Sequence, residues 1–391
     1  MEWKELKEVF DTRNGYTPST SNETFWEGGT IPWFKMEDIR DKGSILNDSY
    51  LHITDKAIKG KGLFKANSLL LATSATIGEH ALIEVEHLCN QRFTNFYPKK
   101  GYENRINMRY AYYYMYIIDE WCKQHVNQGG FASVDMGGLY KLPFPIPSLP
   151  EQQRIVEQLD TFTSSIENLK EQIAQRRKQY EYYRDQLLSF EDGEIIEKLS
   201  FGKDFMLKAR IGWQGLTKKE YRESGDYKLI TGTDFTKYNR IDFDNCVFVD
   251  KERYDQDPYI QIQEDDVLIT KDGTLGKIAY VDKLDMPATL NGGVFVVRDN
   301  SGRVLQKFLM YYLTSFYFVN WMNHNHTQGS IQHLTQALLS KFSIPVISKE
   351  KQKSIICKLD AFTDAIRNLE QQLAQREKQY EFYRNKLLTF D

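Results

Sequence analysis

The residue types best suited to chemistry occur in a few short clusters. His324 and His326 form an HxH pair within NHNHTQGS, but no acidic or cysteine residue lies at ligand spacing from them. Glu264, Asp265 and Asp266 precede an expected strand, where a turn explains them better than an acid–base pair does. The first cluster therefore favours a solvated loop, and neither cluster predicts a catalytic or metal centre.

Sequence motifs for nucleotide or metalloprotease chemistry are also absent. The chain contains no GxxxxGK[ST], no GxGxxG after a strand and no HExxH. The segment DGTLGK at Asp272–Lys277 has its glycines at the wrong spacing for a phosphate-binding loop. These absences predict a binding protein without catalytic activity and without a bound cofactor or metal.

Polar loops that follow expected strands offer groups that could bind DNA. Thr73–Gly78 (TSATIG) and Thr270–Lys277 (TKDGTLGK) contain hydroxyls and glycines, and Asn90–Arg92 supplies side chains that can contact base edges. An ordinary turn is the alternative interpretation of each loop taken singly. The candidate DNA-contacting residues are Thr73, Ser74, Thr76, Asn90, Gln91, Arg92, Thr233, Lys237, Lys271, Asp272, Thr274, Lys277 and Asn291.

The overall charge does not support strong DNA binding by the chain alone. The formal net charge is −3, and residues 1–150 hold 17 Lys and Arg against 18 Asp and Glu. Because neutralisation of phosphates supplies much of the affinity for DNA, this balance predicts weak binding without a partner.

The sequence around these loops predicts a mixture of α-helices and β-strands. Strands are expected at Ser68–Ala72, Phe93–Tyr97, Val267–Thr270 and Gly293–Val297, which are rich in branched and aromatic residues. Aromatic segments of helical character follow at Met108–Trp121 and Leu305–Trp321. The expected fold class is α+β.

An internal repeat organises the chain. At an offset of 200 residues, 19 of 31 positions are identical between Asp160–Phe190 and Asp360–Phe390. Weaker matches include Gln152 with Gln352 and Ile155 with Ile355. We expect a first head (residues 1–147), a first helical segment (148–194), a second head (195–345) and a second helical segment (346–391).

Both helical segments show a heptad pattern, which predicts a coiled-coil seam. The expected seam residues are Leu159, Phe162, Ile166, Leu169, Ile173, Tyr180, Tyr183, Leu187 and Phe190, then Leu359, Phe362, Ile366, Leu369, Leu373, Tyr380, Tyr383, Leu387 and Phe390. Arg176 and Arg376 fall on the same seam. They could fix the register of the two helices as polar residues in the seam, or they could contact a partner subunit.

The direction of the pairing follows from the termini of the second head. Compact domains commonly have close termini, so an antiparallel pair is favoured, with the two heads at opposite ends of a two-helix rod and an approximate two-fold between them. The alternative is that each helix pairs with another molecule.

Cysteine spacing and hydropathy bear on the compartment. Cys89, Cys122, Cys246 and Cys357 form no CxxC, which fits a reducing cytoplasm better than a disulfide framework or a zinc site. The chain has no run of 18 apolar residues and no secretory leader after Met1, so we expect a cytoplasmic protein without membrane contact.

The repeated segments also resemble a known family. PFPIPSLPEQQRIVEQLD (Pro143–Asp160) and the tyrosine-rich ends QYEYYRDQLLSF and QYEFYRNKLLTF are similar to those of the specificity (S) subunits of type I restriction–modification systems. The second copy departs from this pattern, with SKEKQKSIICKLD at Ser348–Asp360. The resemblance covers essentially the whole chain.

This resemblance implies a non-catalytic DNA-recognition subunit. Each head would be a target-recognition domain that reads one half of a split, asymmetric site in double-stranded DNA, and the rod would set the unread spacing. Two methyltransferase (M) subunits would bring S-adenosylmethionine for adenine methylation, and restriction (R) subunits would bring ATP- and Mg-dependent cleavage. The alternatives are a coiled-coil spacer between two protein-binding heads and a fused enzyme with an unrecognised active site.

Overall fold

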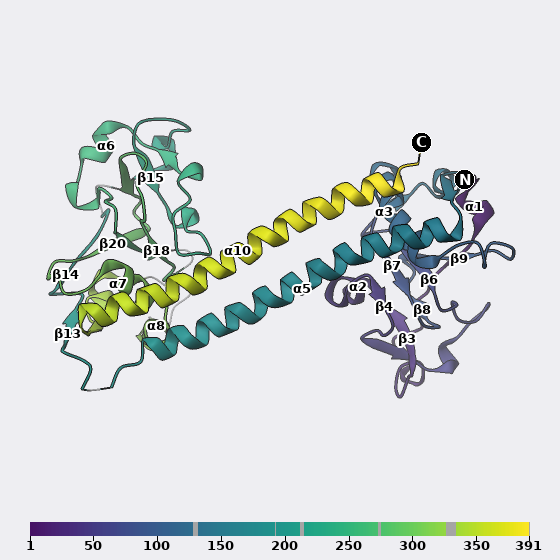
Figure 1. The fold of residues 1–391 in the computed structure, drawn as a ribbon, viewed down its shortest axis with the longest axis horizontal. Helices are drawn as coiled ribbons and strands as arrows, with labels where there is room; N and C mark the ends of the chain where they lie inside the picture. The colour runs from purple at the N-terminus through teal and green to yellow at the C-terminus, as the bar shows by residue number, and fades with distance from the viewer. Residues whose placement is uncertain (128–131, 192, 212–214, 273–274, 326–333, 391) are drawn as a thin grey trace. The chain divides into compact units, whose positions relative to one another are not determined.

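The computed structural model describes residues 1–391 except 128–131, 192, 212–214, 273–274, 326–333 and 391 (Figure 1). The chain divides into two compact units, the first formed by residues 1–168 with 373–391 and the second by residues 169–372. Two long helices, α5 (Leu149–Leu187) and α10 (Lys349–Leu388), contribute one segment to each unit. Each unit therefore combines one head with parts of both helices.

The first head is built on a five-stranded sheet with the strand order β2–β9–β6–β7–β4 and a three-stranded sheet with the order β5–β3–β8. Neighbouring strands are antiparallel except for the pairs β4–β7 and β3–β8, which are parallel. The strands are β1 (Glu2–Glu5), β2 (Phe10–Asn14), β3 (Ile31–Phe34), β4 (Ile45–Leu46), β5 (Leu51–Ile53), β6 (Ser68–Ala72), β7 (His80–Ile83), β8 (Leu88–Cys89), β9 (Phe93–Pro98), β10 (Val126–Asn127), β11 (Ser133–Val134) and β12 (Pro143–Ile146). The helices of this head are α1 (Leu6–Val9), η1 (Glu23–Phe25), α2 (Met36–Lys42), η2 (Asp55–Ala57), α3 (Met108–Gln124) and α4 (Met136–Leu139).

Strand β6 is buried on both faces, which explains its continuous apolar sequence. Because side chains alternate along a strand, Leu69 and Leu71 pack into the cluster that contains α3. Leu70 and Ala72 pack into a second cluster on the opposite face, with Phe93 of β9. The predicted strand at Ser68–Ala72 is confirmed, and the one at Phe93–Tyr97 extends to Pro98.

Helix α3 confirms the predicted helical segment and ends three residues later than expected. The side chain of Asn107 caps its start by accepting hydrogen bonds from the backbone N–H groups of Arg109 and Tyr110. Tyr110 and Tyr113 are fully buried, so α3 covers one face of the large sheet. In Figure 1, α3, the start of α5 and the end of α10 lie side by side in the first unit.

The second head repeats this topology with a four-stranded sheet of order β14–β20–β17–β18 and a three-stranded sheet of order β16–β15–β19. Its strands are β13 (Glu197–Ser200), β14 (Phe205–Ala209), β15 (Lys228–Ile230), β16 (Val247–Phe248), β17 (Val267–Thr270), β18 (Ile278–Tyr280), β19 (Ala288–Leu290), β20 (Val294–Asp299) and β21 (Ser343–Val346). Its helices are η4 (Lys218–Glu220), η5 (Gly232–Asp234), η6 (Phe243–Asn245), α6 (Lys251–Asp255), η7 (Pro258–Ile260), α7 (Gln306–Leu313), α8 (Phe316–Asn325) and α9 (Gln336–Leu339). The predicted strand at Val267–Thr270 is confirmed, and the one at Gly293–Val297 begins at Val294 and extends to Asp299.

The predicted helical segment Leu305–Trp321 is two helices, α7 and α8, and not one. The break falls at Thr314 and Ser315. Their hydroxyls donate to the carbonyl oxygens of Tyr311 and Tyr312, at 2.8 and 2.6 Å. Such local side-chain bonds compete with the helical ladder, which explains why the chain turns there.

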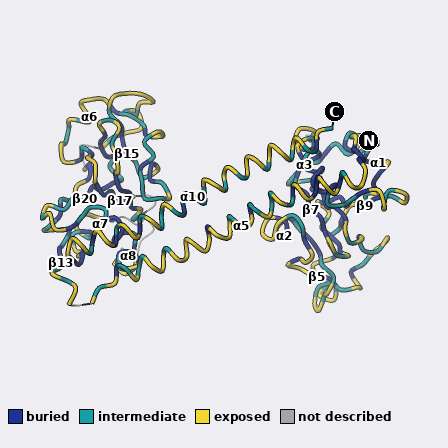
Figure 2. Tube along the Cα trace, viewed as in Figure 1, coloured by how far each residue is buried: buried dark blue, intermediate teal, exposed yellow. Residues whose placement is uncertain are grey.

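Both long helices exist as predicted, and their segments run antiparallel in each unit. In the first unit, Phe162 of α5 stacks on Tyr383 of α10 with 5.3 Å between ring centroids. In the second, Tyr183 of α5 stacks on Phe362 of α10 at 5.5 Å, and Arg177 pairs with Glu370. Figure 2 shows that the middle stretches of both helices are largely exposed, whereas their ends run against buried elements.

The buried side of each helix departs from the predicted seam near the helix end. Tyr183 and Tyr383 are 46% and 42% exposed, so the expectation that they are buried is wrong. Leu188 and Leu388, which lie outside the predicted heptad frame, are only 1% exposed. The reason is that these ends pack on a head and not only on the other helix: Tyr180, Leu187 and Phe190 contact the second head's core, and Tyr380, Leu387 and Phe390 contact the first head's core.

The two seam arginines make different contacts. The guanidinium of Arg376 lies 5.7 Å from the ring centroid of Phe162 in the first unit. Arg176 donates to the side chain of Gln179, one turn along its own helix, at 3.2 Å. Neither contact requires a buried side chain: Arg376 contacts an aromatic ring of the other helix, and Arg176 makes a hydrogen bond on the surface of its own helix.

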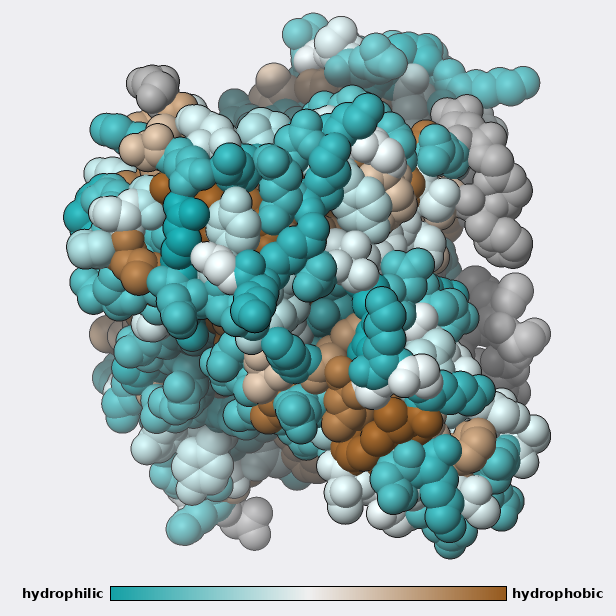
Figure 3. All heavy atoms as spheres, turned by 90° about the vertical axis from the view of Figure 1, so that its right-hand side faces the viewer, coloured by the Kyte–Doolittle hydropathy of each residue, from teal (hydrophilic) through white to brown (hydrophobic). Residues whose placement is uncertain are grey.

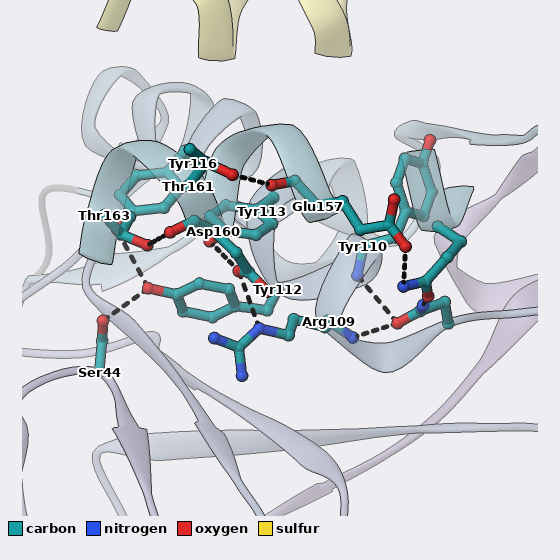
Figure 4. A network of polar contacts seen from close by, with 12 residues as sticks. Ser44, Arg109, Tyr110, Tyr112, Tyr113, Tyr116, Glu157, Asp160, Thr161 and Thr163 are labelled. Carbon is teal, nitrogen blue, oxygen red and sulfur yellow. Dashed lines mark hydrogen bonds and ion pairs between the residues drawn. The ribbon is translucent and has the colours of Figure 1, made fainter. Parts of the chain in front are cut away.

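The start of α5 is fastened to the first head by two polar side chains. Gln152 is fully buried: its side-chain oxygen accepts from Asn107 N, and its amide nitrogen donates to the carbonyls of Arg105 and Pro147. One turn after Val156, Asp160 accepts from Arg109 Nε at 2.9 Å and from the Tyr113 hydroxyl at 2.5 Å (Figure 4). These bonds satisfy polar groups that burial would otherwise leave unpaired.

The same fastening recurs at the start of α10 in the second unit. Gln352 accepts from Leu305 N and donates to the carbonyls of Arg303 and Ile347. Asp360 accepts from Lys307 Nζ at 2.7 Å and from the Tyr311 hydroxyl at 2.6 Å. Glutamine and aspartate therefore recur at an offset of 200 residues because each does the same packing task.

Candidate nucleic-acid interface

In the first head, the loop after β6 and the loop before β9 lie together at one end of the large sheet. Ala72 pairs with Phe93 in the strand register, and Thr73 N donates to the carbonyl of Arg92 at 2.9 Å. The candidate residues of both loops thus come from adjacent strands. A strand end of this kind can present several side chains to one ligand.

The surface residues of this group are Ser74, Gln91 and Arg92. Gln91 and Arg92 are exposed and Ser74 is half-buried. The hydroxyl of Thr73 is hydrogen-bonded to Thr94 at 3.0 Å in the interior, and the hydroxyl of Thr76 is buried with no partner among the described residues. The structure therefore favours Ser74, Gln91 and Arg92 over the two threonines as surface contacts.

Asn90 and Thr17 set the position of the exposed side chains. Asn90 accepts from the backbone N–H of Arg92 at 3.0 Å, which fixes the turn. The Thr17 hydroxyl donates to the Gln91 side-chain oxygen at 2.5 Å. Thr17 was not predicted from the sequence, because it lies 74 positions from its partner and belongs to no motif.

The loop Thr73–Gly78 has a constrained backbone. Ala75 has a φ of 65°, a left-handed value that costs a non-glycine residue about 1 kcal/mol or more. Gly78 also has a positive φ, and a Cβ there would lie 2.8 Å from the carbonyl of Asp119. The neighbouring segment holds the loop through Val134 N, which donates to the Thr73 carbonyl.

A buried contact between a histidine and a carboxylate supports this end of the sheet. His80 of β7 and Asp119 of α3 are 4% and 5% exposed, and Nδ1 of His80 lies 2.5 Å from a carboxylate oxygen of Asp119. The rings of Tyr112 and Tyr116 pack edge-on against His80, at 4.9 and 4.6 Å. The pair ties the loop-bearing strands to α3.

In the second head, Thr233, Lys271, Asp272 and Asn291 gather at the corresponding strand ends. Asn291 N donates to the carbonyl of Ile230, and Lys271 N donates to the carbonyl of Gly293. The Asn291 side chain donates to the Tyr221 hydroxyl and accepts from Gly293 N, so it holds the loop together. Thr233, Asp272 and the nearby Lys277 are exposed, whereas Thr274 lies outside the described residues.

Lys237 lies apart from this group. Its Nζ is 3.0 Å from a carboxylate oxygen of Glu370 on α10, and Glu370 also accepts from Arg177 of α5. Burial alone would raise the pKa of Glu370, but the hydrogen bonds from Arg177 and Lys237 outweigh it and lower that pKa. In this structure Lys237 connects the second head to the long helices.

The acidic and histidine clusters have structural contacts. Asp265 has a left-handed φ of 69° in the turn before β17, and Asp266 pairs with Arg298. Burial raises the pKa of Asp266 in spite of that arginine. Nδ1 of His324 lies 2.8 Å from the carbonyl of Asn320, and His326 is outside the described residues.

Hydrophilic side chains cover most of the face shown in Figure 3, with hydrophobic ones in limited patches. Among the described residues, no group of three or more His, Cys, Asp or Glu could hold a metal ion. In the same part of the chain, no helix has the length and apolarity needed to cross a bilayer.

Three solved or curated relatives share the length of this chain. The putative type I restriction enzyme specificity subunit S.HindORF215P of Haemophilus influenzae is 25% identical over 410 residues, which cover 100% of this chain and 96% of that protein. The S subunit of the type I restriction–modification system from M. genitalium matches with a TM-score of 0.56 and 16% identity, over 100% of this chain and 97% of that one. A structure describing complex assembly and conformational transition of the type I R-M system matches with a TM-score of 0.65 and 14% identity, over 100% and 98%. At such low identity, the two structures show a shared fold.

Higher identity is found with Escherichia coli proteins over part of the chain. The specificity subunit of the type I restriction enzyme EcoprrI is 47% identical over 209 residues, covering 51% of this chain and 52% of that protein. The matched region thus spans about half the length of that relative. The family model described as the type I restriction modification DNA specificity domain matches residues 1–176 and 214–377. The chain therefore belongs to the type I restriction–modification DNA specificity family.

Proposed function

We propose that this chain is the DNA-specificity subunit of a type I restriction–modification complex, in which each head reads one half of a bipartite, asymmetric site. The observation that carries the proposal is the contrast between the heads. Their central strand orders and helix fastenings correspond, but the side chains at the surface of the strand ends differ. They are the half-buried Ser74 and the exposed Gln91 and Arg92 in the first head, and the exposed Thr233 and Asp272 in the second. A common scaffold with different reading side chains suits two different half-sites.

The two long helices would set the unread spacing between the half-sites. They are continuous over 39 and 40 residues, or about 60 Å at 1.5 Å per residue. In this proposal they form a coiled-coil rod, and the distance between half-sites is a geometric property of the scaffold.

The helices would also bind the partner subunits. In the first unit, a groove of about 600 Å³ between the start of α5 and the end of α10 is lined by Arg154, Phe162, Arg376 and Tyr383, among others. Tyr182 and Phe382, which occupy equivalent repeat positions, are 61% and 60% exposed. A groove between the helices and an exposed aromatic residue in the tyrosine-rich part of each helix suit the binding of partner helices, here from methyltransferase (M) subunits.

Catalysis would then belong to other subunits. M subunits would bind S-adenosylmethionine and flip the target adenine out of the duplex, and R subunits would use ATP and Mg²⁺. The role of this chain is to position them on DNA.

Adenine methylation mapped across a genome tests the proposal, with this chain co-expressed with its M partner. We expect one bipartite motif. Deletion of one heptad from each helix, Ile166–Gln172 together with Ile366–Gln372, should change only the unread spacing. A map without a bipartite motif would contradict the proposed function, and a change in the half-sites themselves would contradict the role of the helices in spacing.

A further inference from the structure

The two heads differ sharply in charge at one equivalent connection. In the first head, β5 leads to β6 through residues 54–67, which contain four lysines and one aspartate, a net charge of +3. In the second, β16 leads to β17 through residues 249–266, which contain two basic and seven acidic residues, a net charge of −5. Each connection has a left-handed residue near its end: Asn67 is directly before β6, and Asp265 lies two positions before β17. The same place in the topology therefore has opposite charge.

In the first head, this connection forms one wall of a cleft of about 600 Å³. The other wall comes from β2, β9 and the segment after β9. The charged residues that line the cleft are Arg13, Lys61, Lys65 and Lys100, with Asp11 and Glu103 as the acidic ones. The lining therefore has an excess of two positive charges, within a head whose residues 1–150 carry slightly more acid than base.

Aromatic rings hold two of these cations at the cleft. The guanidinium carbon of Arg13 lies 4.0 Å from the ring centroid of Phe64, and Arg13 donates to the carbonyl of Gly62 at 2.8 Å. Lys65 Nζ lies 4.1 Å from the ring centroid of Tyr97 and 3.3 Å from Glu103. Cations pre-positioned on rings lose less conformational entropy when they bind an anion.

The backbone of the same wall is open to a ligand. Gly60 and Gly62 have φ values of 60° and 80°, and a Cβ at either position would meet nothing within 4 Å. Lys61 lies between them and is exposed, as are Lys56, Lys59 and Lys65. Glycines in this conformation let an anion such as phosphate approach the main chain closely.

A short segment connects this cleft to the predicted reading surface. Three positions after Arg13 comes Tyr16, whose hydroxyl accepts from Lys59 N and donates to the Ala57 carbonyl. Thr17, the next residue, donates to Gln91. The basic connection and the exposed Gln91 are thus fastened to the same short segment, residues 13–17.

We propose that this cleft binds the sugar–phosphate backbone of DNA beside the half-site read by the first head, and that the acidic connection of the second head does not. This inference rests on the proposed function, since it assumes that the first head lies on DNA. Phosphate contacts position a protein without reading sequence, so the cleft would contribute affinity and salt dependence but no specificity.

The test uses the complex of this chain with its M subunits and a duplex that contains the methylated motif. The triple variant Lys61→Gln, Lys65→Gln, Lys100→Gln keeps Arg13, which packs on Phe64. The dissociation constant is measured by fluorescence anisotropy over a series of salt concentrations. The matched control is Lys251→Gln, which removes a lysine from the acidic connection of the second head and from its pair with Asp255.

The slope of log affinity against log salt should fall by about 0.9 for each phosphate that the variant no longer neutralises, or by about 2 to 3 in the triple variant. The preference for the motif over a duplex with an altered half-site should be unchanged, and Lys251→Gln should leave the slope as in the wild type. An unchanged slope in a triple variant that still discriminates overturns the cleft assignment. If the wild-type complex fails to discriminate between the duplexes, the proposed function is contradicted instead.

Discussion

The two units match where they hold the helices and differ where they face outward. Gln152 and Gln352 make the same three hydrogen bonds, and Asp160 and Asp360 each accept from a cation and a tyrosine. In contrast, the connection that carries a net +3 in one head carries a net −5 in the other. The glutamine and aspartate that fasten each helix therefore recur with their partners, whereas the connection between the two sheets of each head keeps its place in the topology but not its charge.

The largest test of this contrast exchanges one head. Replacing residues 1–147 with the head of a related subunit should change one half of the methylated motif and leave the other intact. The donor head needs a cation and a tyrosine at the positions of Arg109 and Tyr113, because Asp160 on α5 binds both. Methylation mapping gives the result, and a change in both halves would refute independent reading.

A second test concerns the equivalence of the two helix ends. Leu188→Ala and Leu388→Ala should each reduce the free energy of unfolding by about 4 kcal/mol, because each side chain is 1% exposed within a core. Hydrogen exchange measured by mass spectrometry should increase in the second unit for Leu188→Ala and in the first unit for Leu388→Ala.

Two exposed aromatic residues, Tyr182 and Phe382, provide the control for the two leucine substitutions. Tyr182→Ala and Phe382→Ala should change stability by about 0.5 kcal/mol or less, since these rings are 61% and 60% exposed. They should nevertheless weaken binding of the M subunit. If Leu388→Ala increased exchange in the second head, the pairing of helix ends with heads would be incorrect.

A third and smaller effect separates the units by pH. Burial lowers the pKa of His87, in the first unit, to about 4 from an ordinary 6.5. Below pH 6.5, His87 becomes protonated in the unfolded chain but stays neutral in the folded head. The stability from this group is therefore complete above pH 6.5 and falls as the pH approaches 4. The loss is about 3 kcal/mol at pH 4.

The second unit contains buried carboxyl groups with the opposite effect. Burial raises the pKa of Asp234 and Asp266, so the stability they contribute is present at low pH and is lost as the pH rises. Thermal unfolding is measured at about pH 7, 5.5 and 4.5, and hydrogen exchange, corrected for the effect of pH, shows which unit loses stability. As the pH falls, the first unit should lose stability first. His87→Phe, between the rings of Phe34 and Phe64, should abolish that loss. The same acid sensitivity in His87→Phe would rule out His87 as its source.

The sequence allowed the long helices, the central strands and the repeat to be predicted, because each carries a strong local period or an identical copy. It did not allow Leu188 and Leu388 to be placed, since their burial depends on contact with a head and not on the heptad frame. The helix break at Thr314 and Ser315 also depends on side-chain hydrogen bonds that no periodicity reports.

The candidate site was predictable only at the level of loops. Thr73 and Thr76 have suitable side chains for DNA, but their hydroxyls are buried, and only the fold decides which way they face. Lys237 has the right charge, but it binds Glu370 on a helix 133 positions later in the chain. The sequence did not predict the cleft, because its lining residues Arg13, Lys61, Lys65 and Lys100 come from three segments of the chain. The concentration of lysines in residues 56–65 could nevertheless have indicated a basic surface.

The division of the chain into units has a consequence for biosynthesis. The second unit is a continuous stretch, residues 169–372, and all of its contacts are available once residue 372 has left the ribosome. The first unit begins at residue 1 but needs residues 373–391, including Leu388, to close its core. The head that is translated first is therefore the last to be completed. Until then its incomplete core exposes apolar surface, which a chaperone or a partner would need to cover.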